Sequence, residues 1–188
     1  SLMEDCHACS AGRYSSIAGL TSGEHCIGLC PAGKFSDETG LSSMDQCTGH
    51  CSAGKYSYEI GLTSDNDCKG RCSIGKYSSL VGLTSDCPRL CPRGKFGNVQ
   101  GSVSQKSGCL NCTRGHMCGD TAMAQPQKCP IGSYQDQNGQ ETCHFCPKNT
   151  YSDSDGTITC SDCPKNSQGM KLKTSGFGAN SINQCELI

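Results

Sequence analysis

Cysteine recurs in this chain at fixed places in a repeated phrase, and this recurrence limits the folds that the chain can adopt. There are 19 cysteines in 188 residues. The phrase Cys-Ser-Ala-Gly-Arg-Tyr-Ser begins at Cys9, runs on to Gly-Leu-Thr-Ser and closes at Cys26. Cys30, Cys51 and Cys72 each open a closely similar phrase. The sequence is therefore a tandem array of small repeats bounded by cysteines.

The repeats are too small to fold around ordinary hydrophobic cores. Most are about 20 residues long, below the roughly 40 residues under which a domain usually needs disulfides, metals or assembly. The chain has no Trp, and a cysteine content above about 8–10% is typical of a disulfide scaffold in an oxidising compartment. We expect a small disulfide-rich fold, an elongated solenoid-like rod of tandem repeats with short irregular β-hairpins and almost no helix.

Charge and hydropathy argue against two classes of partner. The 16 basic and 17 acidic residues are interspersed, so no basic face is concentrated enough to bind a row of phosphates, and we do not expect nucleic acid as a partner. No stretch reaches the roughly 18–20 apolar residues of a membrane span, and the first residues lack the apolar core of a signal peptide. We expect an extracellular or cell-surface location, with this chain a mature product or a slice of a longer precursor.

Glycine and aromatic residues recur at fixed distances from each opening cysteine. Glycine is the usual residue at positive φ and asparagine the next most tolerated, so we expect a left-handed turn at the third residue after the opener. An aromatic ring follows two residues later in most repeats and can cover the disulfide of the neighbouring repeat. A second glycine, ten residues after the opener, divides each repeat into two short extended arms, which predicts a minimal β-hairpin. The third-residue positions are Gly12, Gly33, Gly54, Gly75, Gly94, Gly115 and Gly132, then Asn149 and Asn166.

A basic residue follows the third-residue glycine in the first five repeats. Regular stacking would align these side chains as a cationic ladder, which could be a ligand-binding stripe or a solvated face, and we favour the solvated face. The residues are Arg13, Lys34, Lys55, Lys76 and Lys95.

One pairing rule accounts for almost every cysteine: each opener bonds the cysteine that closes its repeat. Spacing alone does not fix the connectivity. The rule predicts Cys9–Cys26, Cys30–Cys47, Cys51–Cys68, Cys72–Cys87, Cys91–Cys109, Cys129–Cys143, Cys146–Cys160 and Cys163–Cys185, with Cys112–Cys118 closing a small loop. Cys6 has no partner under this rule. We interpret it either as the end of a preceding repeat or as a cysteine that bonds a neighbouring molecule.

The gap between a closing cysteine and the next opener divides the array. We assign 1–8 to the end of a preceding repeat, and 9–111 to five long repeats with three-residue gaps. Residues 112–128 form an irregular repeat and a candidate bend, where the twist of the rod changes because linker length sets the rotation between neighbours. Residues 129–188 form three repeats with two-residue gaps, of which the last is extended.

The extension of the last repeat carries apolar side chains with little local core to enter. We predict a candidate contact surface that includes Met170, Leu172 and Phe177.

The phrase Cys-Pro-Ala-Gly-Lys-Phe-Ser at 30–36 resembles the ephrin-receptor-like, or growth-factor-receptor-like, cysteine-rich repeats. The stretch from Cys109-Leu-Asn-Cys112 through Cys143-His-Phe-Cys146 is especially similar to that family. The resemblance covers nearly the whole chain and implies a module rather than a function, because such arrays occur in receptors, protist surface antigens and extracellular fibrous proteins. The nearly identical first repeats resemble those in long surface proteins of unicellular eukaryotes and algae. Ephrin binding is not implied, since these repeats form the stalk in that receptor family.

Other chemistries explain fewer of the cysteines. The Cys-x-x-Cys pairs Cys143/Cys146 and Cys160/Cys163 have spacing that suits tetrahedral zinc, but the disulfide rule accounts for them together with all the others. A redox Cys-x-x-Cys needs a helix N-terminus, and no segment reads as a helix of useful length. We predict no metal or other cofactor and no catalytic residue.

A few single residues have weaker signals. Asp153-Ser-Asp155-Gly156 resembles the start of a calcium loop but lacks the glutamate that an EF-hand requires. Asn111-Cys-Thr113 is the single standard N-glycosylation sequon. The histidines His7, His25, His50, His116 and His144 share no repeat position, so we interpret them as exposed linker residues.

Two functions fit these features. The first is an extracellular structural protein, a disulfide-stapled rod that self-assembles into a filament, surface coat or cell appendage through a surface repeated at regular intervals. The second is the stalk or ligand-binding ectodomain of a receptor-like surface protein that contacts other extracellular proteins. Binding patches of receptors usually cluster aromatic or Arg anchors, whereas this chain spreads one ring per repeat, so we favour the first.

Overall fold

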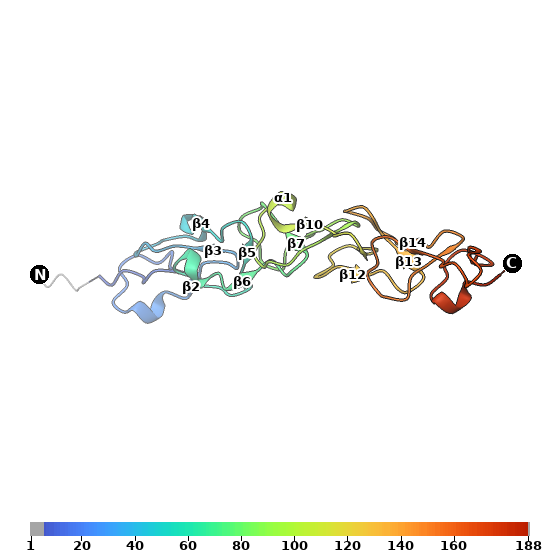
Figure 1. The fold of residues 1–188 in the computed structure, drawn as a ribbon. Helices are drawn as coiled ribbons and strands as arrows, with labels where there is room; N and C mark the ends of the chain where they lie inside the picture. Colours follow the sequence, from blue (N-terminus) through green and yellow to red (C-terminus); the bar gives the residue numbers. More distant parts are fainter. Residues whose placement is uncertain (1–5, 188) are drawn as a thin grey trace, which may run out of the picture. The chain divides into compact units, whose positions relative to one another are not determined.

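The computed structural model describes residues 6–187 and divides them into two compact units. The first compact unit contains residues 6–89 and Val99–Ser107, and the second contains Leu90–Asn98 and residues 108–187. Residues 1–5 of the predicted N-terminal segment, and Ile188 of the last repeat, lie outside the described residues. Each unit is a series of short hairpins joined by irregular loops (Figure 1).

The first compact unit contains three antiparallel hairpins, β1·β2, β3·β4 and β5·β6. In each, a strand that begins four residues after an opening cysteine pairs with the residues just before the next opener; Tyr14, for example, lies opposite Gly28. The strands are β1 (Arg13–Tyr14), β2 (Gly28–Leu29), β3 (Lys34–Phe35), β4 (Gly49–His50), β5 (Lys55–Tyr56), β6 (Gly70–Arg71) and β7 (Lys76–Tyr77). Short 3-10 turns precede the closing cysteines: η1 (Gly23–His25), η2 (Met44–Gln46) and η3 (Asp65–Asp67).

The second compact unit repeats the arrangement with four hairpins. They are formed by β9 (Lys95–Phe96) with β10 (Leu110–Asn111), β11 (His116–Met117) with β12 (Gln127–Lys128), β13 (Ser133–Tyr134) with β14 (His144–Phe145), and β15 (Thr150–Tyr151) with β16 (Ser161–Asp162). The unit ends with η4 (Ile182–Gln184). Two elements, β8 (Arg89–Leu90) and α1 (Gln105–Gly108), span the boundary between the units.

Short hairpins and near absence of helix are confirmed, but the arm between the second glycine and the closing cysteine is not the strand that pairs with the first arm. Gly19, with φ of 73°, lies in the loop between β1 and β2. The strand instead pairs with the gap residues, and the amide of Cys30 donates to the carbonyl oxygen of Gly12 at 2.9 Å. The disulfide of each repeat holds the closing cysteine beside the opener, so the gap residues that follow it are carried alongside the strand.

The left-handed turn at the third residue is confirmed at all seven glycines and at Asn149, whose φ is 70°. It closes with a hydrogen bond such as that from the amide of Arg13 to the carbonyl oxygen of Ser10. The prediction is wrong at Asn166, where φ is not positive and Gly169 takes the left-handed conformation instead. The last repeat has replaced the tight turn with a longer loop.

The core consists of disulfides covered by rings from the preceding repeat. Among the described residues, the buried apolar residues are cysteines together with Leu41, Leu62 and Ala179. Tyr14 packs against the cluster of Leu41 and the next repeat's disulfide, and Phe35 packs in the same way one repeat later. The expectation that one ring covers its neighbour's disulfide is confirmed for these two repeats.

Each repeat is bonded to the next by main-chain hydrogen bonds. The amide of Ser15 donates to the carbonyl oxygen of Leu41 at 3.1 Å, and the amide of Gly40 donates to that of Cys9 at 2.7 Å. The same pair of bonds recurs in the second compact unit, where Gln135 donates to Thr157 and Gly156 donates to Cys129. The repeats are therefore joined as a stack within each unit, and each hairpin relies on its neighbours because two strand residues alone cannot hold it.

In the part of the chain that the structure describes, no helix has the length and hydropathy that crossing a membrane would require.

Candidate functional site

Eighteen cysteines lie in nine disulfides that join the opener and closer of each repeat. The pairs are Cys9–Cys26, Cys30–Cys47, Cys51–Cys68, Cys72–Cys87, Cys91–Cys109, Cys112–Cys118, Cys129–Cys143, Cys146–Cys160 and Cys163–Cys185. Cys6 is a free, exposed thiol. The Cys-x-x-Cys pairs weighed as zinc ligands thus belong to separate disulfides, which leaves them no thiolate to bind a metal. Within residues 6–187 no other group of His, Cys, Asp or Glu is arranged to hold a metal ion.

The basic side chains at the fourth residue of each repeat are bound within their own repeats in three of the five cases. Lys55 pairs with Asp65 at 2.6 Å, and Lys76 pairs with Asp86 at 2.9 Å. The guanidinium of Arg13 donates to the carbonyl oxygen of Cys26 at 3.2 Å. These cations therefore brace the loop that leads to the closing cysteine, a role that neither the ligand stripe nor the solvated face predicted.

Asp86 is held in its ionised form by several donors. One carboxylate oxygen accepts from the amides of Ser73 at 3.0 Å and Cys87 at 2.7 Å, while the other faces Lys76. Partial burial alone would raise its pKa, but these hydrogen bonds outweigh burial and lower the pKa to about 2. Asp65 occupies the equivalent place one repeat earlier, where Lys55 and Ser52 lower its pKa against the effect of burial.

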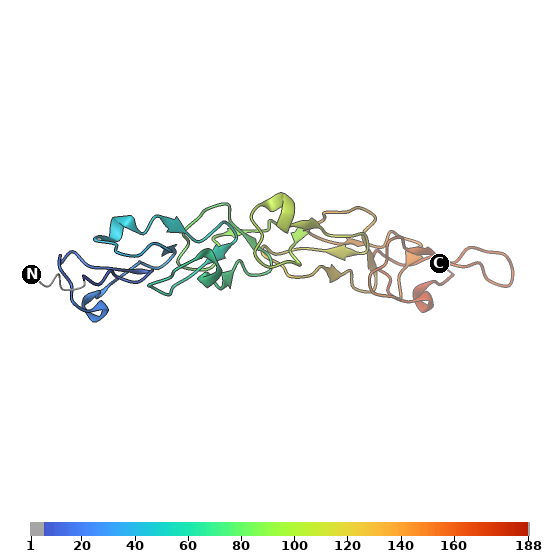
Figure 2. The ribbon, with the colours of Figure 1, turned by 90° about the vertical axis from the view of Figure 1, so that its left-hand side faces the viewer.

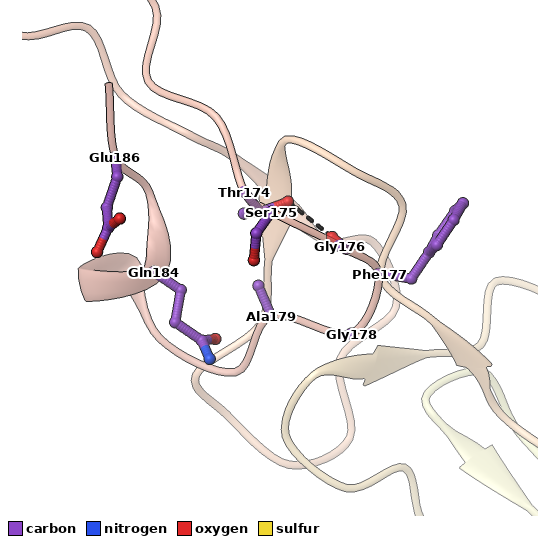
Figure 3. A pocket seen from close by; sticks show the side chains of 8 residues that line it. All are labelled: Thr174, Ser175, Gly176, Phe177, Gly178, Ala179, Gln184 and Glu186. Carbon is purple, nitrogen blue, oxygen red and sulfur yellow. Dashed lines mark hydrogen bonds between the residues drawn. The ribbon is translucent and has the colours of Figure 1, made fainter. Parts of the chain in front are cut away.

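The three residues of the predicted contact surface lie in different settings. Met170 and Phe177 are exposed, whereas Leu172 is half-buried. Phe177 borders a shallow hollow of about 190 Å³, smaller than the roughly 300–1,000 Å³ of small-molecule pockets. Figure 3 shows its ring pointing away from the hollow, whose wall is formed mainly by small and polar residues. The lining consists of Thr174, Ser175, Gly176, Phe177, Gly178, Ala179, Gln184 and Glu186, so it includes neither Met170 nor Leu172.

Two exposed rings lie close to the same backbone. The ammonium of Lys148 lies 5.7 Å from the centre of the Phe177 ring, within the range of a cation–π interaction. Phe145 is exposed as well, and its ring lies beside Gly178, the residue that follows Phe177. This end of the second compact unit therefore offers an aromatic surface without a formed pocket.

A larger set of exposed apolar side chains occupies the loop tips of the first compact unit. These tips lie seven to nine residues after the opening cysteine, and each apolar side chain there is more than half exposed. They are Ile17, Tyr58, Ile60, Leu80, Val81 and Val99. In the second compact unit the equivalent tips are polar, with Asp120, Gln137 and Ser154 at the middle position.

The structure shows the surroundings of the glycosylation sequon and of the aspartate in the sequence that resembles a calcium loop. Asn111 lies in β10, exposed and against Gly139, directly before the disulfide-bonded Cys112. Asp155 accepts a hydrogen bond from the amide of Ile131, in the preceding repeat, at 3.2 Å. Of the histidines, His50 and His144 are exposed, as expected, although His50 lies beside Gly82 and the His144 ring lies 5.9 Å from that of Tyr134.

The residues that join repeats were visible in the sequence but were not singled out. The sixth residue after the opener is buried at Ser36, Ser57, Ser78 and Ser152, and its main chain bonds the next repeat. Gly28, Gly49 and Gly70 lie directly beneath the aromatic rings of their hairpins, where any side chain would collide. Both sets recur at fixed spacing in the sequence, and this spacing could have identified them as residues that join or pack the repeats.

The last part of the chain matches a known family. Residues 137–185 match the model of the "Tyrosine-protein kinase ephrin type A/B receptor-like" family, a receptor-like cysteine-rich repeat rather than a catalytic family. No curated protein sequence matches the chain. The match and the nine disulfides together point to an extracellular or cell-surface location.

Proposed function

We propose that this chain is a structural segment of an extracellular or cell-surface protein, in which stacked disulfide-bonded repeats associate with copies of themselves. The association is side by side, and its contact surface is the set of apolar loop tips of the first compact unit. Assembly of this kind produces a filament or a surface coat.

The repetition of the tips is the observation that carries this proposal. Four of the five long repeats present at least one apolar side chain at the same place in the loop. Burying one such side chain contributes about 1.5–3 kcal/mol, which is too little for stable association alone. Several tips presented together multiply the effect without any single strong contact. The tip of the second repeat, Asp37-Glu38-Thr39, is the exception, because it carries charged and polar side chains in place of an apolar one.

The net charge of the chain supports association between identical copies. It is −1, so copies experience little long-range repulsion when they approach. None of the described hollows is large and enclosed enough to indicate a small-molecule substrate instead.

Sedimentation velocity over a hundredfold range of protein concentration tests this proposal, with negative-stain imaging of the same samples. The natural chain is expected to form larger species as the concentration rises. The double variant Tyr58→Asp, Ile60→Asp is expected to stay monomeric, because charge at a tip must be desolvated on contact.

The matched control is Ile131→Asp, which changes an exposed apolar residue of the second compact unit that is not at a loop tip. This variant is expected to associate like the natural chain. A natural chain that remains monomeric at all concentrations contradicts the proposal, as does a tip variant that still associates.

A stalk or ligand-binding ectodomain is the second candidate. It is favoured by the family match over 137–185 and by the exposed rings of Phe145 and Phe177 in the same region. In that case the chain stays monomeric, and substituting these two rings, rather than the loop tips, abolishes binding of an extracellular partner.

A further inference from the structure

Within each compact unit, a repeat also contacts the second repeat that follows it. A Cβ atom on the third-residue glycine would lie closer than 3.0 Å to the carbonyl oxygen of the second glycine two repeats further on, a distance that real Cβ atoms do not adopt. The contacts are Gly12 with Gly61, Gly33 with Gly82 and Gly54 with Gly101 in the first compact unit, and Gly94 with Gly139, Gly115 with Gly156 and Gly132 with Gly178 in the second. The third residue must therefore be glycine for space as well as for its positive φ.

Asn149 occupies the third-residue position of its repeat but carries a side chain where the other repeats discussed above have glycine. Its φ of 70° keeps the left-handed turn, so its conformation is the same as that of the glycines. Its amide donates to the Thr174 hydroxyl at 2.8 Å, whereas Gly132 one repeat earlier donates to a main-chain carbonyl. The Cβ atom of Asn149 occupies the place into which a repeat two further on would bring its carbonyl oxygen. A repeat stacked by the common rule cannot fit there.

The last repeat departs from the rule at the same turn. In other repeats the fourth residue bonds the first, as in Lys34 to Pro31 at 3.0 Å, with two residues between them. In the last repeat the equivalent bond joins Leu172 to Pro164 at 2.9 Å, and residues 165–171 lie between them.

The inserted residues form a hairpin of their own. Lys165 lies opposite Lys171, and the amide of Asn166 donates to the carbonyl oxygen of Met170 at 2.8 Å. The Asn166 side chain accepts from the amides of Gln168 at 3.0 Å and Met170 at 2.9 Å, which closes the tip. Figure 2 shows a long loop in the colours of this region extending from the last repeat.

The hairpin lies at the edge where another repeat would have to stack. It replaces the turn whose glycine, in other repeats, bonds the next repeat and touches the one after it, as Gly132 does with Ser152 and Gly178. A hairpin that projects from this turn occupies space that a following repeat would need. At the first repeat, by contrast, no described atom lies within 4 Å of a Cβ position on the second glycine, Gly19, so none of the described residues occupies that edge.

We propose that Asn149 and the hairpin 164–172 cap the stack, so that the edge of the last repeat does not accept a further repeat of this type, whatever sequence follows. The second compact unit then has a closed edge at its Cys163 end, whereas the first compact unit keeps, at its Cys9 end, an edge that accepts another such repeat. This cap does not depend on the proposed self-association. It does prevent copies from joining end to end if the last repeat of one copy would have to stack on a repeat of another. Capping repeats are a general requirement of stacked-repeat proteins.

Appending repeats to the whole chain tests this directly. A copy of residues 51–90 is added after Ile188, which gives the three-residue gap of the long repeats between Cys185 and the copied Cys51. In an opened version of this longer chain, Asn149→Gly is combined with replacement of residues 165–171 by Ala-Gly, the pair that precedes Lys55. A positional control carries the same copy after His50, inside the stack. Intact mass without reduction selects species with all disulfides formed.

Hydrogen exchange at the amide of the copied Gly61 is the measurement, because stacking gives that amide the carbonyl oxygen of the preceding opener as its acceptor. Protection by a factor of about 1,000 or more is expected in the positional control, and at least about 100-fold less in the appended natural chain. In the opened version, this amide is expected to be protected at least about tenfold more than in the appended natural chain. Equal protection in the appended natural chain and the positional control overturns the proposal. So does an opened version that regains none while the control is protected.

Discussion

Gly12 lies against Gly61, two repeats further along the chain, so closely that a Cβ atom on Gly12 would come within 3.0 Å of the Gly61 carbonyl oxygen. The two residues belong to repeats that are separated by a complete intervening repeat with its own disulfide. The contacts that stabilise this fold therefore reach beyond adjacent repeats, whereas the stability of simple stacked-repeat proteins is described by contacts between adjacent repeats alone. Disulfides close each repeat, and the glycine contacts fix the position of a repeat relative to the second one that follows it.

Phe35→Ala is expected to destabilise the repeat that follows it. The ring is half-buried and packs against Leu62 and the Cys51–Cys68 disulfide, so its loss is expected to cost about 1–3 kcal/mol of unfolding free energy, less than for a fully buried ring. Guanidinium unfolding without reductant measures this cost. Dithiothreitol is expected to reduce Cys51–Cys68 faster in the variant than in the natural chain.

The control for this prediction is Tyr58→Ala, which removes an exposed ring and is expected to change the free energy by no more than about 0.5 kcal/mol. Equal effects of the two substitutions would show that the Phe35 ring does not cover the disulfide.

Acid is expected to weaken the fold through Asp86. Its pKa is about 2 in the folded chain and about 3.8 without the fold, so its contribution is complete above about pH 5 and is lost as the pH falls through 2. The shift corresponds to roughly 2.4 kcal/mol, and because the side chain is 27% exposed we expect about 1–2 kcal/mol in solution.

Guanidinium unfolding between pH 2 and pH 6 for the natural chain and Asp86→Asn measures this contribution. The difference between the two chains is expected to shrink as the pH falls. Asp37→Asn, at an exposed loop tip, is the control and should leave the pH profile unchanged. A constant difference between the natural chain and Asp86→Asn across this range would contradict the assignment.

Cys6 is expected to be the single thiol that reacts with iodoacetamide in the folded, unreduced monomer. It is free and exposed, while the other cysteines are paired. Intact mass is expected to show one added group, and none in Cys6→Ser. Addition of two or more groups would show that a disulfide is missing, and a dimer that reductant dissociates would show that Cys6 bonds a second copy.

The local geometry of the repeats could be predicted from the sequence because it depends on residues that lie close together in it. The left-handed turn at Gly12 follows from the alternation of glycine and asparagine at the third position, and it appears in the structure with φ of 75°. The ring of Tyr14 on the neighbouring repeat follows from one aromatic residue per repeat and a chain with little else to bury.

The contacts that set the stack could not be predicted in the same way. Nothing in the phrase around Gly12 indicates that Gly61, 49 positions later, faces it, since that depends on the rotation between repeats. Asn166 fits the sequence pattern, yet the inserted residues after it move the turn to Gly169. Lys55 and Lys76 appeared solvated because their carboxylate partners, Asp65 and Asp86, occur in only two of the five long repeats.

Comparison of Gly12→Ala with Gly19→Ala tests the stacking rule most directly. Both glycines belong to the first repeat and have nearly the same φ, 75° and 73°, so the conformational cost of alanine, about 1–2 kcal/mol, is common to both. Of these two glycines, only Gly12 faces another repeat among residues 6–187. Gly12→Ala is therefore expected to lower the free energy of unfolding by about 1–3 kcal/mol more than Gly19→Ala, as measured by guanidinium unfolding without reductant. Equal losses for the two variants would contradict the stacking of each repeat on the second one that follows.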